Sequence, residues 1–173
     1  MFENPIVNLD EIPKSEDVSF VALHHDYGKI VRFNSAVTLI LGIAVAAAVF
    51  FLTDKEEKKY VIAAVLVLSM FLSLFPLISY RRKKYAFRLH DVLFKKGLFY
   101  KTIHISPYIR LQHVVIRQSW LAKRLGLATL SLYTAANNHS DISIPGLTLE
   151  EAERWKSFLL NRLQDLEDES ESI

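Results

Sequence analysis

The chain has 173 residues, 51% of them hydrophobic, with a formal net charge of +2 and no cysteine. The absence of cysteine excludes disulfides, thiolate catalysis and cysteine-ligated metals. The small net charge conceals an uneven distribution of charged side chains. Residues 85–147 carry eight Lys or Arg against two Asp, whereas residues 148–173 carry eight acidic side chains against three basic ones.

Residues 1–32 are expected to form a cytoplasmic N-terminal segment. Its first 17 residues are acidic and interrupted by proline, which is typical of an extended or flexible chain. Residues 18–23 are apolar enough for a short strand or for an interfacial piece that leads into the first run. The sequence His24-His25-Asp26 carries metal-ligating side chains, but adjacent residues do not share a face of a helix and no other ligand set is close by. We therefore expect no metal and no cofactor.

Two charge-free runs, residues 33–53 and 60–80, dominate the next part of the chain, and each is 21 residues long. At 1.5 Å of rise per residue, such a helix reaches about 31 Å, close to the thickness of the hydrocarbon core of a bilayer. Only the charged stretch 54–59 separates them, so the chain must turn back at once. The sequence predicts a transmembrane helical hairpin over residues 33–80.

Two other interpretations of these runs are disfavoured. A pair of core helices in a soluble protein would show a polar stripe, and neither run has one. A secretory signal would lie at the N-terminus behind a short basic segment, whereas more than 30 residues, with six acidic and only three basic side chains, precede the first run. No Asp, Glu, Lys, Arg or His lies inside either run, which argues against a channel or transporter.

The distribution of Lys and Arg around the two runs predicts the orientation of the hairpin. Six basic residues lie next to the outer ends of the runs, and three lie in the turn 54–59 between them. Because the side richer in Lys and Arg stays in the cytoplasm, we expect a cell-membrane protein with two spans and both termini cytoplasmic. Small residues would let the two helices pack closely. They are Gly42, Ala44, Ala46 and Ala48 on the first run and Ala63, Ala64, Ser69 and Ser73 on the second.

After Lys84 the hydrophobic period changes to two, which predicts a mostly antiparallel β domain over residues 81–165. The expected strands are residues 85–89, 92–96, 98–106, 109–118, 129–134 and 142–144. A helical turn is expected at residues 120–126, with Trp120 in the core. Thr148 and Glu151 form a capping box that opens a C-terminal amphipathic helix, and residues 166–173 form an acidic tail that should fray.

Several segments of this domain resemble a known family. They are Arg110-Leu111-Gln112-His113-Val114, the stretch from Ser119 to Leu130, Thr134-Ala135, and Ile144-Pro145-Gly146-Leu147. These residues resemble the YdbS-like membrane-flanked bacterial PH-like domain proteins over about residues 30–165. The resemblance implies an α+β fold in which a transmembrane hairpin precedes a small antiparallel β-barrel or sandwich capped by a C-terminal helix. Ala136-Asn137 departs from the family pattern, in which glycine follows Thr-Ala.

The resemblance also implies a non-enzymatic role and a complex with a larger membrane protein that carries several PH-like domains; homo-oligomers are a further option. The sequence contains no catalytic motif, and nucleic acid is not expected as a partner. We thus expect a membrane-anchored scaffold that binds a membrane-protein partner at the cytoplasmic surface. The alternative is a sensor of anionic lipid headgroups. Its candidate contacts are Arg81, Arg82, Lys83, Lys84, Arg88, Lys95, Lys96 and Lys101.

Overall fold

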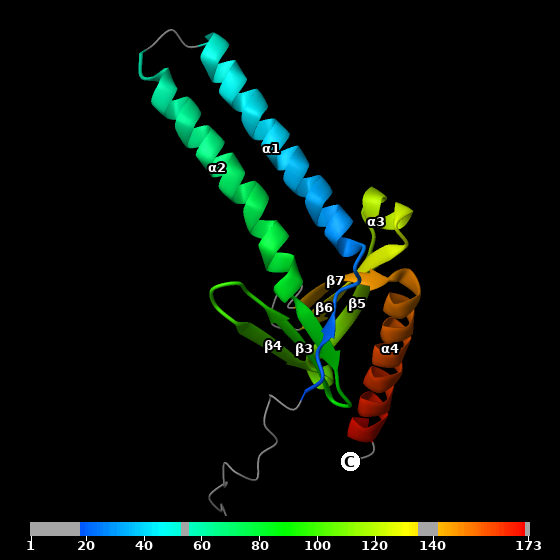
Figure 1. Cartoon of the computed structure of the whole chain (residues 1–173). Helices are drawn as coiled ribbons and strands as arrows, with labels where there is room; N and C mark the ends of the chain where they lie inside the picture. The colour runs from blue at the N-terminus through cyan, green and yellow to red at the C-terminus, as the bar shows by residue number, and fades with distance from the viewer. Residues whose placement is uncertain (1–17, 53–55, 135–141, 172–173) are drawn as a thin grey trace, which may run out of the picture.

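Two long apolar helices rise from one side of a small β domain in this computed structural model, which describes residues 18–52, 56–134 and 142–171, with side chains to residue 165 (Figure 1). Helix α1 spans Tyr27–Leu52 and helix α2 spans Lys58–Ser79. Their most apolar windows have mean hydropathies of 2.5 and 2.7, and only 11% of each window is buried. Core helices of a soluble protein are mostly buried, so both helices suit a bilayer. Helix α1 begins six residues before the predicted start.

Small residues bring the two helices into close contact, as the sequence predicts. Gly42 faces Ser69 so closely that a side chain on Gly42 would collide with the Cβ atom of Ser69. Nearer the domain, the hydroxyl of Ser73 donates a hydrogen bond of 3.0 Å to the backbone carbonyl of Ser35. Hydrogen bonds of this kind join helices inside a membrane, where water does not compete for the polar groups.

The β domain consists of two antiparallel sheets with short helical segments between the strands. The first sheet has the order β1 (Val21–Ala22), β2 (Lys84–Phe87), β3 (Asp91–Lys96), β4 (Thr102–Pro107). The second has the order β5 (Leu111–Arg117), β6 (Leu127–Thr134), β7 (Ile142–Thr148). The helical segments are η3 (Tyr80–Arg82), η4 (Tyr108–Arg110), α3 (Trp120–Arg124) and α4 (Leu149–Glu171). No ladder joins the two sheets among the described residues, so the domain is a sandwich and not a closed barrel.

Helix α4 covers the second sheet and completes the core, as Figure 1 shows. Its stripe residues Ala152 and Leu159 are fully buried. The indole of Trp155 stacks on Phe87 of the first sheet, with ring centroids 4.0 Å apart. The capping box is confirmed, since the Thr148 amide donates to the Glu151 carboxylate at 2.9 Å and the Glu151 amide donates to the Thr148 hydroxyl at 3.2 Å.

Element boundaries differ from the expectations where turns intervene. Strand β4 starts only at Thr102, because Gly97 adopts φ 113° and begins the turn between β3 and β4. Strand β7 was expected to stop before Pro145, but it continues to Thr148. It can do so because Pro145 lies where the register between β6 and β7 shifts, on a strand at the edge of its sheet, and proline is accepted at such positions. Helix α4 continues to Glu171, beyond the point where fraying was expected.

Residues 18–26, which precede α1, are part of the β domain, whereas residues 1–17, expected to be extended or flexible, lie outside the described residues. Val21 pairs with Tyr85, so β1 extends the first sheet. The amide of His24 donates a hydrogen bond of 2.9 Å to the carbonyl of Gly146 in β7. A side chain on Gly146 would approach Tyr27 at 2.8 Å, and Gly146 also has φ 67°. The start of α1 is therefore attached to both sheets, which fixes the base of the hairpin on the domain.

Candidate functional site

Six basic side chains gather around one hollow, which we call the basic hollow. It has a volume of about 190 Å³ and is lined by Arg81, Arg82, Lys84, Lys95, Lys96, Gly97 and Lys101. The residues come from η3, β2, the end of β3 and the segment before β4. The register explains their meeting, since Lys84 pairs directly with Lys95, and Lys96 pairs with Thr102, the neighbour of Lys101. Six of the eight predicted lipid contacts thus lie together.

The basic hollow carries unbalanced positive charge. Within the described part of the chain, no carboxylate lies within ion-pair distance of any of the six cations. Like charges that face each other across a sheet repel, so the Lys84 and Lys95 pairing costs stability unless an anion approaches. Lys95 has one favourable contact, with its ammonium 5.2 Å from the centre of the Phe20 ring. The arrangement attracts anionic groups.

Arg88 is not part of the basic hollow. It follows β2 at the opposite end of the β2–β3 hairpin, where Phe87 pairs with Val92. Its guanidinium binds the Asp91 carboxylate in a two-pronged ion pair, with Nε donating to Oδ1 at 2.6 Å. Its backbone carbonyl accepts a hydrogen bond of 2.7 Å from the hydroxyl of buried Tyr108. Arg88 therefore holds the turn between β2 and β3 together.

Lys83 also lies apart, although its neighbours in sequence line the basic hollow. It ends η3 in an extended conformation and lines a different cleft, between α1 and α2 at their domain-side ends. Burial, and secondarily the charge of Lys96, lower the pKa of the Lys83 ammonium. Four consecutive basic residues are thus divided between two sites.

Exposed aromatic side chains flank the base of the hairpin, and those on the β3–β4 turn were not among the predicted site residues. Phe99 and Tyr100 on that turn are 81% and 86% exposed. Figure 1 shows this turn near the end of α2, and α3 near the start of α1. Both residues belong to the segment 98–106 that was expected to form a strand, so their exposure on a turn was not predicted. Aromatic rings are frequent where a protein meets the membrane–water interface.

Trp120 was expected in the core, and this prediction is wrong. Its side chain is 61% exposed and packs edge-to-face on Phe33 of α1. The Ser119 hydroxyl accepts a hydrogen bond of 3.2 Å from the Ala122 amide and so caps α3. Within this short helix, Ala122 is the residue that points into the domain, which leaves Trp120 facing α1.

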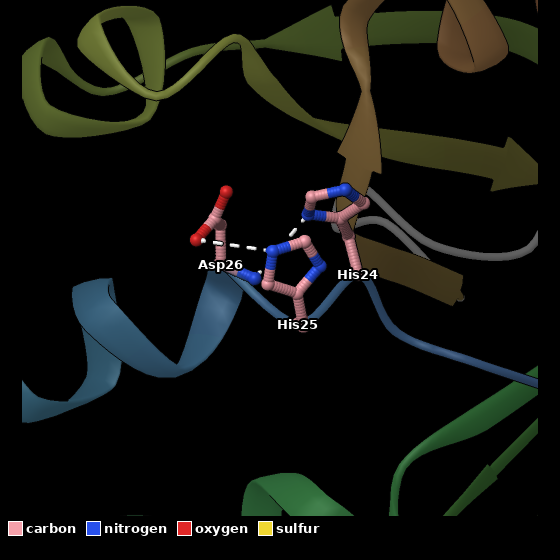
Figure 2. A group of neighbouring side chains, drawn as sticks. All are labelled: His24, His25 and Asp26. Atoms are coloured by element: carbon pink, nitrogen blue, oxygen red, sulfur yellow. Dashed lines mark hydrogen bonds and ion pairs between the residues drawn. The ribbon is translucent and has the colours of Figure 1, made fainter.

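His24, His25 and Asp26 form the turn before α1, and Figure 2 shows their side chains clustered there. One potential ligand atom from each lies within 4.8 Å of the others. The expectation that no metal binds here relied on helix geometry, which does not apply to a turn. Two of the three side chains interact within the turn: Nδ1 of His24 accepts from the Asp26 amide at 3.2 Å, and the Asp26 carboxylate pairs with Lys29 at 2.6 Å. The Lys29 hydrogen bond lowers the pKa of Asp26. The cluster thus stabilises the start of α1.

Comparison with known proteins agrees with this architecture. The family described as "Bacterial PH domain" matches residues 35–165. A curated transmembrane protein of Bacillus subtilis (strain 168), YdbS, is 35% identical over 127 residues, which cover 72% of this chain and 78% of that protein. No solved structure matches the chain. The family match covers most of α1, all of α2 and the β domain from β2 to most of α4.

Proposed function

This transmembrane chain belongs to the bacterial PH domain family, and we propose that its β domain binds anionic phospholipid headgroups at the cytoplasmic membrane surface. The observation that carries this proposal is the basic hollow. Six cations from separate segments converge there without a carboxylate partner among the described residues. Each basic residue near an anionic membrane contributes about 1 kcal/mol of binding free energy.

The topology supports the same proposal. Arg81 and Arg82 directly follow α2, so the basic hollow adjoins the end of a membrane-spanning helix. Six basic residues flank the domain-side ends of the helices, against three in the turn between them, which favours a cytoplasmic domain and cytoplasmic termini. The cytoplasmic leaflet is also the one whose surface potential is most negative, so headgroups and cations would meet without a large movement of the domain.

The test uses the full-length protein in nanodiscs and measures the acylation rate of individual lysines. In nanodiscs that contain phosphatidylglycerol, Lys95, Lys96 and Lys101 should react at least several-fold more slowly than in phosphatidylcholine nanodiscs, because headgroup phosphates cover them. The protection should decrease at high salt, since exposed ion pairs are screened. Lys156 on α4, away from the basic hollow, serves as an internal reference.

A matched pair of triple variants separates site from net charge. Replacing Lys95, Lys96 and Lys101 with Gln should abolish the preference of the protein for phosphatidylglycerol over phosphatidylcholine. Replacing Arg154, Lys156 and Arg162 on α4 with Gln removes the same charge and should leave the preference in place. Equal effects of the two variants, or equal lysine reactivity in both kinds of nanodisc, would contradict the proposal.

A second candidate function is a scaffold that binds a membrane-protein partner, one that carries several PH-like domains. The specific observation in its favour is the edge strand β4, which pairs with β3 alone among the described strands. Ile103 and Ile105 on β4 are 37% and 54% exposed. An apolar edge strand of this kind recruits an extended segment of another chain by strand addition.

Co-purification from native membranes in mild detergent tests this second function. A stoichiometric membrane-protein partner should be retained by the wild-type chain. It should be lost in Ile105→Asp, which places a charge on the exposed edge, and kept in the variant with Lys95, Lys96 and Lys101 replaced by Gln. The opposite pattern of loss and retention would assign the partner to the basic hollow instead of β4.

A further inference from the structure

The two membrane helices enclose a cleft at their domain-side ends, separate from the basic hollow. Its volume is about 300 Å³. Residues that line it include Asn34, Ser35 and Thr38 from α1 and Leu72 and Phe75 from α2, with Lys83 beyond the end of α2. In the part of the cleft farther from the β domain, the α2 side is apolar and the α1 side carries hydroxyl and amide groups. Such a distribution suits an amphiphilic molecule.

Ser35 gives the cleft an unusual polar group. Its side chain is only 4% exposed, and its Oγ atom has no hydrogen-bond partner among the described residues. The neighbouring hydroxyls behave differently: Ser69, Ser73 and Thr38 each donate to a backbone carbonyl, at 2.9, 3.0 and 3.0 Å. An unpartnered buried hydroxyl is costly, above all in a hydrocarbon environment. A ligand that accepts a hydrogen bond from Ser35 would remove this cost.

Lys83 supplies a positive charge to the same cleft. Its side chain is half-buried, and no carboxylate pairs with it in the described ranges. Burial lowers the pKa of its ammonium, which means that the surroundings disfavour the charge. A nearby anion would restore the balance, because opposite charges compensate each other's desolvation when they pair. Lys83 thus favours an anionic group over a neutral one in the cleft.

We propose that this cleft binds one anionic phospholipid, with its phosphate on Lys83 and an ester oxygen accepting a hydrogen bond from Ser35. The acyl chain would then lie along Leu72 and Phe75. The surroundings supply this occupant, since the cleft lies between two membrane-spanning helices and opens where headgroups meet acyl chains. A bound lipid would join α1, α2 and the β domain at their common base. This site differs from the basic hollow in its residues and in its depth.

Native mass spectrometry of the full-length protein, delipidated and then titrated with phosphatidylglycerol, tests the proposal. One lipid should bind the wild-type chain more tightly than any that follow. Lys83→Met should weaken this first event at least about tenfold, as expected for loss of a charge pair that is shielded from solvent. Ser35→Ala should weaken it several-fold. Lys83→Arg should retain it, and phosphatidylcholine should bind more weakly than phosphatidylglycerol.

The neighbouring Lys84→Met provides the matched control, because Lys84 faces the basic hollow. Lys84→Met, and the variant with Lys95, Lys96 and Lys101 replaced by Gln, should keep the first lipid and lose later, salt-sensitive ones. If these variants remove the first lipid and Lys83→Met does not, the cleft proposal is wrong and the basic hollow proposal stands. If Lys83→Met removes the first lipid and the other variants change no binding event, the basic hollow proposal is wrong and the cleft proposal stands. A transmembrane partner that occupies the cleft in place of lipid, and leaves when Ser35 is changed, would also overturn the proposal.

Discussion

Trp120 of α3 packs edge-to-face on Phe33 of α1, with ring centroids 5.5 Å apart and ring planes at 83°. The contact joins the β domain to a membrane helix through two aromatic side chains that both remain largely exposed. The Arg124 guanidinium also contacts Trp120 and lies 5.9 Å from the centre of its ring. A tryptophan that lies beside a cation and contacts the first turns of an apolar helix is typical of the membrane–water interface.

The first prediction concerns the depth of Trp120. In proteoliposomes, lipids brominated near the headgroup should quench a large part of the protein fluorescence. Trp120→Phe should lose most of this quenching, because the remaining Trp155 is stacked on Phe87 in the core. Trp155→Phe should keep it. Equal quenching of the two variants would show that Trp120 does not reach the interface.

The second prediction concerns the close contact of Gly42 with Ser69. Gly42→Leu should destabilise the hairpin by about 1–3 kcal/mol, because the new side chain must push α2 away. Thermal unfolding of the purified protein in one detergent measures the loss. Val45→Leu, on the exposed side of α1, adds volume without a clash and should leave stability nearly unchanged.

A compensating substitution tests the same contact independently. Gly42→Ala alone should destabilise the protein, and Ser69→Gly in the same chain should recover most of the loss. Contacting residues give such non-additive effects, whereas distant residues add. Strictly additive effects of the two substitutions would indicate that the helices do not meet at this point.

The sequence predicted those elements whose signals are local. The runs 33–53 and 60–80 lack charge, so the hairpin follows from composition, and Thr148 with Glu151 mark the start of α4 by their spacing. The predicted boundaries of the elements were wrong where tertiary contacts override local preference. Pro145 is tolerated inside β7 because it lies in a register shift of the β6–β7 ladder, on a strand at the edge of its sheet, and both features depend on pairing.

The candidate site was predictable in composition but not in arrangement. The six cations of the basic hollow are all among the eight predicted contacts, yet Arg88 lies at the β2–β3 turn, and Lys83 is separated from Lys84 after the turn at η3. Trp120 was misplaced because its environment is a residue of α1, far away in sequence. Apolar neighbours such as Leu121 cannot distinguish a core from a membrane interface, since both favour the same side chains.

The third prediction concerns the capping box of α4. Thr148→Ala should lower the free energy of unfolding by about 1 kcal/mol, because the Glu151 amide loses its acceptor. Glu151→Ala should destabilise similarly by removing the acceptor of the Thr148 amide. The double variant should cost less than the sum of the two, since the bonds are reciprocal. Glu153→Ala changes an exposed residue of α4 outside the capping box and should have little effect on stability. A comparable loss of stability in this variant would contradict the role of the capping box.

The fourth prediction concerns His104, which lies on β4 opposite Phe94 and has a buried Nε2 atom. Burial, and secondarily the charge of Lys96, lower the pKa of its imidazole below the model-compound value of 6.5. The unfolded chain therefore binds a proton at His104 more readily than the folded chain does. By linkage, stability should fall as the pH decreases through about 6.5 towards the lower pKa of the folded state.

Unfolding midpoints of the full-length protein, measured in one detergent between about pH 7.5 and pH 5, check this expectation. His104→Gln removes the titrating group and should flatten the decrease on the acid side. His113→Gln, an exposed residue on β5, provides the control and should leave the wild-type slope in place. A slope that His104→Gln leaves unchanged, or that His113→Gln abolishes, would assign the acid sensitivity to other groups. A slope of opposite sign would mean that the folded protein holds His104 charged, against the effect expected from its burial and from Lys96.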